Sequence, residues 1–289
     1  MVNINEHSIT QAVLDRLDNC DNPRLKTVMT SLIRHLHDFA REVQLSEEEW
    51  MTGIQFLTTT GHKCDDKRQE FILLSDTLGL SMLTVAMQNA KPPGATEATV
   101  FGPFHIDQAP EYQAGQDIAN GASGEPLFVS ARILNTKGEA VAGARVNVWQ
   151  ADADGLYDVQ RPELHNHQVR GIVHSDKQGL IAFQTVLPVS YPVPTDGPVG
   201  QMLLATGRHP WRPAHVHFKI DAPGYQTLIT HVFRDDDDYL QSDVVFGVRS
   251  SLLGKYIRHE AGKSPDGQTM ATPFYTLNFD FVLDPKAAP

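Results

Sequence analysis

The fold is decided around residues 208–218, which read RHPWRPAHVHF. Within this run, His215 and His217 are separated by a single apolar residue and follow Arg212. Successive side chains of a β-strand point to opposite faces, so both imidazoles are expected on the same face. Two imidazoles side by side on a strand can form half of a metal site. Histidines in strands also commonly pair buried polar groups, so the rest of the chain has to decide between these interpretations.

Short stretches of alternating apolar residues surround this run. Leu127, Val129, Ala131 and Ile133 alternate with polar or exposed positions. The further candidate strands are Val146–Gln150, Gly179–Val186, His215–Ile220, Leu228–Phe233 and Phe274–Val282. Turn clusters separate these strands, an arrangement typical of a β-sandwich or barrel. Two long loops, 101–126 and 161–212, are expected to carry function.

The first hundred residues have a helical pattern instead. Asn22-Pro23 is an N-cap followed by proline at the first helical position. Capping boxes are expected at Ser8–Gln11 and Ser46–Glu49, and a further helical run is expected from Lys67 to Asn89, broken near Gly79. One helical face is predicted from apolar residues three and four positions apart, namely Leu25, Val28, Leu32, Leu36, Phe39 and Val43. The prediction is a mostly β protein with a helical domain at 1–100 and a β-sandwich domain at 101–289.

Composition narrows the classes of partner and compartment. The chain has 289 residues and a net charge of −11, which argues against a nucleic-acid partner or an anionic membrane surface. Only two cysteines are present, and the N-terminus lacks the regions of a signal peptide, so we expect a reduced, cytoplasmic protein without a disulfide framework. The acidic run Asp235–Asp238 is expected to be a solvated loop, because the spacing of a calcium-binding loop is absent.

Two tyrosines are candidates for the other half of a metal site. Tyr157 follows the turn Asp154-Gly155, and Tyr191 lies in a proline-rich segment of little conformational freedom. A tyrosine binds metal only as phenolate, and a highly charged cation lowers its pKa from about 10. Phenolate oxygen and imidazole both suit ferric iron. Each tyrosine taken alone is equally compatible with an ordinary half-buried hydroxyl.

The ordered pattern is more specific than any one residue. Residues 146–157 read VNVWQADADGLY, followed by Tyr191-Pro192 and then Arg212-Pro213-Ala214-His215-Val216-His217-Phe218. This pattern closely resembles the intradiol ring-cleaving dioxygenases, and the resemblance extends through residues 73–76 and 95–104 to nearly the whole chain. Within the family it is most similar to the members that cleave hydroxyquinol, through residues 191–200, the lead-in 207–211 and Thr230-His231-Val232-Phe233.

The resemblance implies a role for each matched position. A non-haem Fe(III) would be bound by Tyr157, Tyr191, His215 and His217. Tyr191 would leave the metal and take up a substrate proton, Tyr157 would stay bound, and Arg212 would stabilise the negative charge that develops on the substrate. The substrate pocket would be lined by Leu73, Asp76, Val100, Phe101, Gly102, Pro103, Phe104, Val193, Pro194 and Arg212. His231 stands where catechol-cleaving relatives usually carry glutamine.

The implied reaction is cleavage of hydroxyquinol (benzene-1,2,4-triol) by O2 to maleylacetate (3-hydroxy-cis,cis-muconate), with no organic cofactor. The resemblance also implies a homodimer formed through the N-terminal helices, with a possible bound phospholipid. Three alternatives stay open at this point. The protein could be a catechol 1,2-dioxygenase that gives cis,cis-muconate, a transthyretin-like binding module suggested by residues 127–157, or a zinc hydrolase that uses His215 and His217. The last lacks a His-Glu-x-x-His motif.

Overall fold

A computed structural model describes residues 3–65 and 68–286. The chain divides into two compact units, of which the first ends at Thr59 and the second begins at Thr60. Lys67, where the sequence predicts the start of a helix, lies outside the described residues. The predicted boundary near residue 100 is a division by role, and it stays a prediction.

The first unit is helical. It contains α1 (Ile9–Leu14), the 3-10 helix η1 (Asp15–Asn19), α2 (Pro23–Glu42) and most of α3 (Glu47–His62). Two of the predicted caps are present. The Asn22 Oδ1 accepts from the Leu25 N–H at 3.0 Å, and Ser46 and Glu49 exchange backbone-to-side-chain hydrogen bonds of 2.9 and 3.2 Å. The capping box predicted at Ser8 is wrong, because its hydroxyl accepts from the Asn5 N–H instead of capping α1.

The predicted apolar face of α2 is exposed. Its members are Leu25, Val28, Leu32, Leu36, Phe39 and Val43. Trp50, Ile54 and Leu57 of α3 are exposed as well. A row of exposed apolar residues along a helix is unusual on a protein surface. Such patches mark interaction sites.

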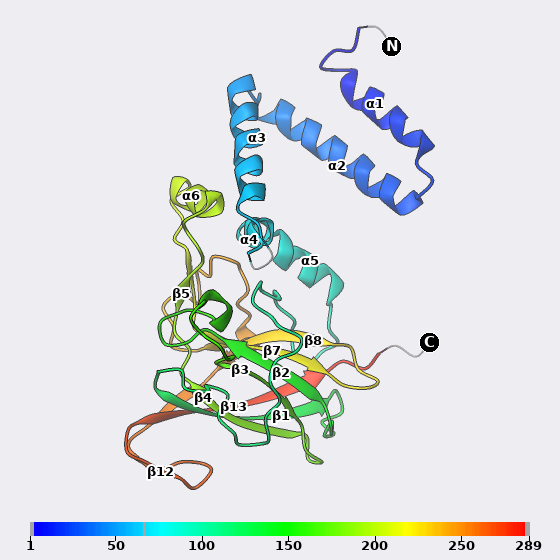
Figure 1. Ribbon diagram of the computed structural model, residues 1–289. Helices are drawn as coiled ribbons and strands as arrows, with labels where there is room; N and C mark the ends of the chain where they lie inside the picture. The colour runs from blue at the N-terminus through cyan, green and yellow to red at the C-terminus, as the bar shows by residue number, and fades with distance from the viewer. Residues whose placement is uncertain (1–2, 66–67, 287–289) are drawn as a thin grey trace. The chain divides into compact units, whose positions relative to one another are not determined.

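The second unit contains the β-sandwich, as the sequence predicts (Figure 1). One sheet has the order β3-β2-β7-β8-β9, and the other has the order β10-β13-β1-β4. The first sheet is formed by β3 (Arg170–His174), β2 (Arg145–Gln150), β7 (His215–Asp221), β8 (Leu228–Arg234) and β9 (Leu253–Gly254). The second sheet is formed by β10 (Tyr256–His259), β13 (Phe274–Leu283), β1 (Pro126–Asn135) and β4 (Leu180–Val186). The strand β1 pairs parallel with β13, so the first and last strands of this unit are neighbours.

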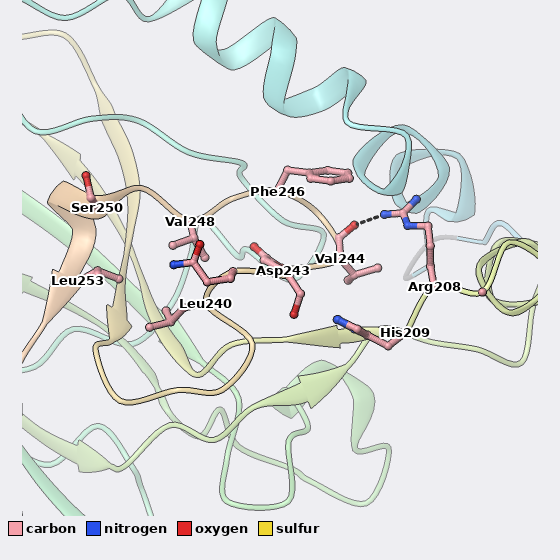
Figure 2. Close-up of a pocket in the computed structure, with 12 residues that line it drawn as sticks. Arg208, His209, Leu240, Asp243, Val244, Phe246, Val248, Ser250 and Leu253 are labelled. Carbon is pink, nitrogen blue, oxygen red and sulfur yellow. Dashed lines mark hydrogen bonds between the residues drawn. The ribbon is translucent and has the colours of Figure 1, made fainter.

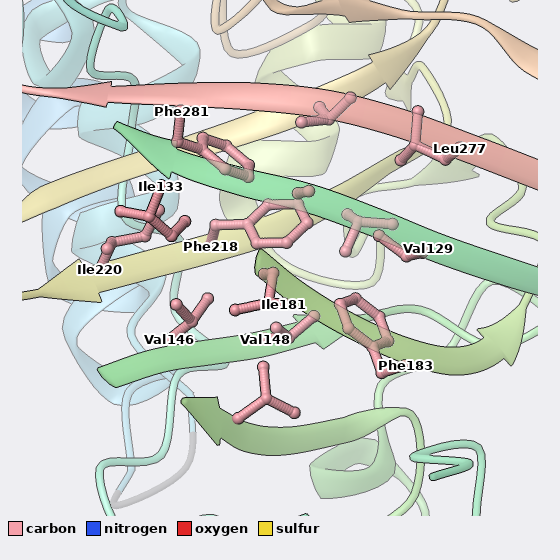
Figure 3. Close-up of a cluster of buried hydrophobic side chains, with 14 of the residues drawn as sticks. Val129, Ile133, Val146, Val148, Ile181, Phe183, Phe218, Ile220, Leu277 and Phe281 are labelled. Carbon is pink, nitrogen blue, oxygen red and sulfur yellow. The ribbon is translucent and has the colours of Figure 1, made fainter. Parts of the chain in front are cut away.

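The core lies between the two sheets (Figure 3). Val146 and Phe218 reach it from the five-stranded sheet, and Ile133, Phe183 and Phe281 reach it from the four-stranded sheet. All five are 1% exposed or less. The strand β7 faces this core with Val216, Phe218 and Ile220. Its alternate residues therefore lie on the opposite face of the sheet.

That opposite face carries a row of aromatic rings. Trp149 of β2 lies opposite His217 of β7, which lies opposite His231 of β8. All three side chains are 2% exposed or less. A strand with one solvated face would show alternating burial, but β2 is buried at nearly every position. The loop before β1 covers this face of β2, because the Asn147 amide of β2 donates to the Ile106 carbonyl of the loop at 2.8 Å.

Helices and short strands complete the second unit. They are α4 (Glu70–Thr77), α5 (Leu80–Gln88), η2 (Asp158–Gln160), β5 (Tyr191–Pro192), α6 (Pro198–Ala205), β6 (Trp211–Arg212), η3 (Ser250–Leu252), β11 (Gly262–Lys263) and β12 (Thr269–Met270). The predicted break near Gly79 is confirmed, with Gly79 at φ +77° between α4 and α5. The predicted loop 161–212 is more ordered than expected. Besides β4, which the sequence predicts, it contains the unpredicted strand β3, the helix α6 and the two-residue ladder β5–β6.

Among the described residues, no single helix has both the length and the apolar composition to cross a membrane. The pair α4 and α5 passes that test only when taken together, and it is bent by 76°.

Candidate metal centre

The two histidines of β7 lie on the same face of the strand, as predicted. Their Nε2 atoms are 3.1 Å apart, and each side chain is 2% exposed. Burial lowers the pKa of both imidazoles well below 6.5, and the charge of Arg212 adds to the effect at His215. Both rings are therefore neutral, which is the state that binds metal.

The tautomer of His215 is determined by its backbone neighbour. Its Nδ1 lies 2.7 Å from the Pro213 carbonyl oxygen, which can only accept, so Nδ1 carries the proton. The lone pair of a neutral His215 is then on Nε2, the atom that points toward His217. A ring N–H donated to a backbone carbonyl is the usual way in which a metal-binding histidine is oriented.

The two tyrosines meet the histidines at the same point. The Tyr157 hydroxyl lies 2.8 Å from His217 Nε2 and 3.0 Å from the Tyr191 hydroxyl. Tyr157 is fully buried and Tyr191 is 6% exposed. Burial raises the pKa of Tyr157 well above 10, and the neighbouring Tyr191 raises it further. Without a cation the Tyr157 phenol therefore keeps its proton.

The spacing of the four donor atoms suits a single bound ion. Two donors that lie about 2.1 Å from one ion at right angles are about 3 Å apart. The three contacts between neighbouring donors are 2.8, 3.0 and 3.1 Å. Two oxygens and two neutral ring nitrogens form a donor set for a transition metal rather than for Ca²⁺ or Mg²⁺. The cluster is consistent with a metal site.

Two glycines make room for these ligands. Gly155 has φ +79°, and a Cβ there would lie 2.8 Å from the Tyr191 Cβ. Gly102 has φ +76°, and a Cβ there would lie 3.1 Å from the His217 Cε1. One face of the His217 ring is stacked on Trp149, with ring centroids 4.7 Å apart and planes at 15°. The imidazole of His217 is thus bounded by a backbone turn at its Cε1 edge and by an indole on one face.

Arg212 lies beside the donor atoms and is itself buried. Its Nη1 lies 3.2 Å from His215 Nε2 and 3.4 Å from the Tyr191 hydroxyl. The sequence did not single out its partner, Asp243, which accepts from Arg212 Nε at 3.2 Å and from Nη2 at 3.4 Å. Burial disfavours the charged guanidinium, but Asp243 outweighs it and raises the pKa of Arg212. Arg212 is therefore a fixed cation next to the Tyr191 hydroxyl.

A cavity of about 250 Å³ opens next to Tyr191 and Arg212. The structure brings nine of the ten residues of the predicted pocket to its wall, namely Leu73, Asp76, Val100, Gly102, Pro103, Phe104, Val193, Pro194 and Arg212. It does not bring Phe101 there. The Phe101 side chain lies between two inward-facing neighbours and points elsewhere, with its ring 4.7 Å from that of His105.

Sequence reasoning missed several residues of the cavity wall. These are Arg68, Gln69, Glu70, Val159, Gln160 and Val245. Glu70 is 1% exposed and forms an ion pair with Arg68, whose Nε donates to its carboxylate at 2.9 Å. Arg68 also reaches Asp196 at 2.8 Å, so two charged segments of the chain meet at this wall. A buried glutamate at the start of a helix carries no sequence signal that separates it from an exposed one.

His231 joins the histidine cluster from β8. Its ring is stacked on His215 at 4.6 Å and lies 4.0 Å from that of His217. Potential ligand atoms of the three histidines all lie within 4.8 Å of one another. The Val100 backbone lies near the His231 ring, but neither ring nitrogen reaches hydrogen-bond geometry with any described residue. The sequence assigned no role to His231. The structure places it on the neighbouring strand β8, opposite His217 and beside both β7 histidines.

A second, larger cavity of about 660 Å³ has Asp243 in its wall (Figure 2). Arg208 is held at its edge, where the guanidinium donates to the Val244 carbonyl at 3.0 Å and to the Thr77 carbonyl at 2.6 Å. Phe246 lies near the same guanidinium, 5.2 Å from its centre. Asp243 therefore lines this cavity and also accepts hydrogen bonds from Arg212 beside the donor cluster.

Comparison with known proteins identifies the family. A family model described as Dioxygenase matches residues 100–285, and one described as Catechol dioxygenase N terminus matches residues 22–96. The chain is 58% identical over 285 residues to a 6-chlorohydroxyquinol 1,2-dioxygenase of Cupriavidus pinatubonensis, with 99% of each chain covered. It is 49% identical to a hydroxyquinol 1,2-dioxygenase of Nocardioides simplex, with 97% of this chain and 96% of that relative covered.

Solved structures agree with these relatives. The crystal structure of hydroxyquinol 1,2-dioxygenase from Pseudomonas putida superimposes with a TM-score of 0.91 at 48% identity, covering 97% of this chain and 99% of that chain. Catechol 1,2-dioxygenase from Pseudomonas arvilla superimposes with a TM-score of 0.85 at 25% identity, covering 96% and 92%. The resemblance carried by the tyrosine and histidine motifs is thereby confirmed, and the chain belongs to the intradiol ring-cleavage dioxygenases.

Proposed function

We propose that the protein cleaves hydroxyquinol with O2 between its two adjacent hydroxylated carbons, giving maleylacetate. The observation that carries the proposal is the convergence of two phenol oxygens and two imidazole nitrogens beside a cavity of about 250 Å³. Relatives named for hydroxyquinol or its chlorinated form match at 46–58% identity. Relatives named for catechol match at 33% and 25% identity. Cleavage of catechol to cis,cis-muconate is the alternative.

We infer that the metal is a non-haem Fe(III) held by Tyr157, Tyr191, His215 and His217. When bound, ferric iron would supply a Lewis acid and a template for the two adjacent oxygens of a diol. Because burial raises the pKa of Tyr157, a highly charged cation would be needed to hold this phenol as a phenolate. No organic cofactor is included in the proposal.

The residues around the donor atoms are assigned their own tasks. Tyr191 lines the cavity, so its phenolate oxygen is placed to receive a proton from the diol as substrate enters. Tyr157 lies deeper and stays in place. The fixed cation of Arg212, beside the Tyr191 hydroxyl, stabilises negative charge as it develops on the substrate. The apolar walls around Leu73 and Val193 exclude water from the reacting ring.

Asp76 is proposed to select the third hydroxyl of hydroxyquinol. It is 6% exposed on the cavity wall, and burial raises the pKa of its carboxyl. A carboxyl there can hydrogen-bond a ring hydroxyl that catechol lacks. Asp76→Leu is expected to lower kcat/KM for hydroxyquinol at least tenfold more than for catechol. An unchanged ratio between the two substrates would contradict this assignment.

The experiment that tests the whole proposal combines metal analysis with a substrate panel. Purified protein is expected to contain iron, to be red to purple from tyrosinate-to-iron charge transfer, and to release a ring-opened diacid from hydroxyquinol faster than from catechol. Catechol turnover that is much faster would replace the substrate assignment. A colourless protein that stays inactive after iron loading would overturn the metal assignment, and zinc in the analysis would favour a hydrolase.

We further propose that residues 1–100 serve as a dimerisation and linker domain and residues 101–289 as the catalytic domain, although Leu73 and Asp76 also reach the cavity. The exposed apolar stripe of α2 supports a homodimer, and a phospholipid bound between two such helices would cover it further. Sedimentation showing only monomer at micromolar concentration would contradict the dimer. Mass spectrometry of an organic extract tests for the lipid.

Both cysteines are free, which supports a cytoplasmic location.

A further inference from the structure

The acidic run Asp235–Asp238 is not the uniform solvated loop that the sequence suggests. Asp235, Asp236 and Asp238 are exposed, as expected. Asp237 is half-buried, and its carboxylate turns inward. The run follows β8 directly, so it lies at one end of the sheet that carries the two β7 histidines.

One oxygen of Asp237 joins two distant parts of the chain. Its Oδ2 accepts from the Ala214 backbone N–H at 2.8 Å and from the Ser190 hydroxyl at 2.5 Å. Ser190 directly precedes Tyr191, and Ala214 directly precedes His215. The other oxygen, Oδ1, accepts from the Tyr239 backbone N–H at 2.9 Å. Both oxygens of this carboxylate are therefore engaged.

The loop that carries Asp237 is itself anchored at the same place. The Arg234 backbone N–H donates to the Ala214 carbonyl at 3.0 Å, so Ala214 is held through both its N–H and its carbonyl group. The Arg234 Nη1 also donates to the Pro188 carbonyl at 3.4 Å. The side chain of Asp237 thus connects two backbones that the loop already contacts.

We propose that Asp237 is a positioning residue that sets the separation of Tyr191 and His215. This inference rests on the proposed function, in which both residues bind iron and Tyr191 leaves the metal during each turnover. Because Ser190 is tied to Asp237, the backbone of Tyr191 stays fixed and only its side chain moves. The phenol can then return to the same position beside His215 after product leaves. Residues that orient metal ligands typically change metal affinity or activity about 10- to 100-fold when mutated.

Two variants test the proposal, and the run supplies its own control. Ser190→Ala removes only the contact next to Tyr191, whereas Asp237→Ala removes the contacts with Ser190 and Ala214 and also the one with the Tyr239 backbone N–H. Ser190→Thr keeps a hydroxyl and is expected to behave as wild type. The neighbouring Asp238→Ala removes an exposed carboxylate of the same run and serves as the matched control.

The readouts separate a positioning role from a purely structural one. Relative to Asp238→Ala, we expect Ser190→Ala and Asp237→Ala to shift the tyrosinate-to-iron absorption band. We also expect them to release iron to a chelator about 10- to 100-fold faster and to lower kcat more than they change KM. If both variants keep the wild-type band and iron-release rate, the inference is wrong, even if their melting temperatures fall. A wild-type protein without that band would instead overturn the iron assignment on which the inference rests.

Discussion

Gly102→Ala is expected to loosen the metal centre without replacing any ligand. Gly102 has φ +76°, a conformation that costs an L-residue roughly 1–2 kcal/mol. The added Cβ would also lie 3.1 Å from His217 Cε1, a contact that forces the ring to give way by a few tenths of an ångström. The ring has little room to retreat, because one face is stacked on Trp149 and the His231 ring lies 4.0 Å away. We expect His217 to be displaced from the other donors and iron to be lost about tenfold faster.

Gly115→Ala is the matched control for this change. Gly115 has φ +83° and is half-buried like Gly102, but a Cβ there has nothing within 4 Å. Both variants should lose roughly 1–2 kcal/mol of unfolding free energy from the backbone. Only Gly102→Ala should also release iron faster to a chelator and lose intensity in the tyrosinate band. Equal iron-release rates in the two variants, measured on protein loaded with one equivalent of iron, would refute the steric argument.

Three further outcomes follow from the charges around the site. Arg212→Ala is expected to lower kcat/KM about 100- to 1000-fold, and Arg212→Lys should not restore it, because both Nε and Nη2 are bound to Asp243. Asp243→Ala leaves the buried Arg212 cation without its partner, so urea unfolding of the iron-free protein should show an unfolding free energy lower by about 3–5 kcal/mol. An unfolding free energy equal to that of the wild type would contradict the buried pair. Burial and then Lys219 lower the pKa of His105 from 6.5 to about 4, so this ring is neutral when folded but takes a proton near pH 6.5 when unfolded. The stability that His105 contributes in its neutral form is therefore complete above pH 6.5 and is lost as the pH falls toward 4. His105→Gln should flatten this part of the plot of unfolding free energy against pH. An unchanged plot would contradict the assignment.

The fold was predictable where the residue pattern has a physical period. The alternation in β1, β7 and β13 follows from burial of one face, and the cap at Asn22-Pro23 follows from the unpaired N–H groups at a helix start. The helix α6 was missed because it is short and stands between prolines, although Pro198 at its first turn is a usable signal.

The candidate site was predictable where it depends on local motif, and less so where it depends on register or burial. His215 and His217 share a face whatever surrounds them. His231 joins them only because β8 pairs with β7 in a particular register, which one strand sequence does not reveal. Asp237 and Asp243 are indistinguishable from exposed aspartates until the fold shows which carboxylates turn inward.

The parallel pairing of β1 with β13 has a consequence for how the protein is made. The strand β1 (Pro126–Asn135) takes its place in the four-stranded sheet beside β13 (Phe274–Leu283), which follows β1 and all other strands of that sheet in the chain. A ribosome has therefore to synthesise the chain as far as β13 before that sheet can close. The helices of the first unit can form while synthesis continues, whereas the four-stranded sheet is complete only after β13 has been synthesised. Incompletely translated chains would expose an unpaired β1 edge, so this enzyme is expected to depend on protection of nascent chains during that interval.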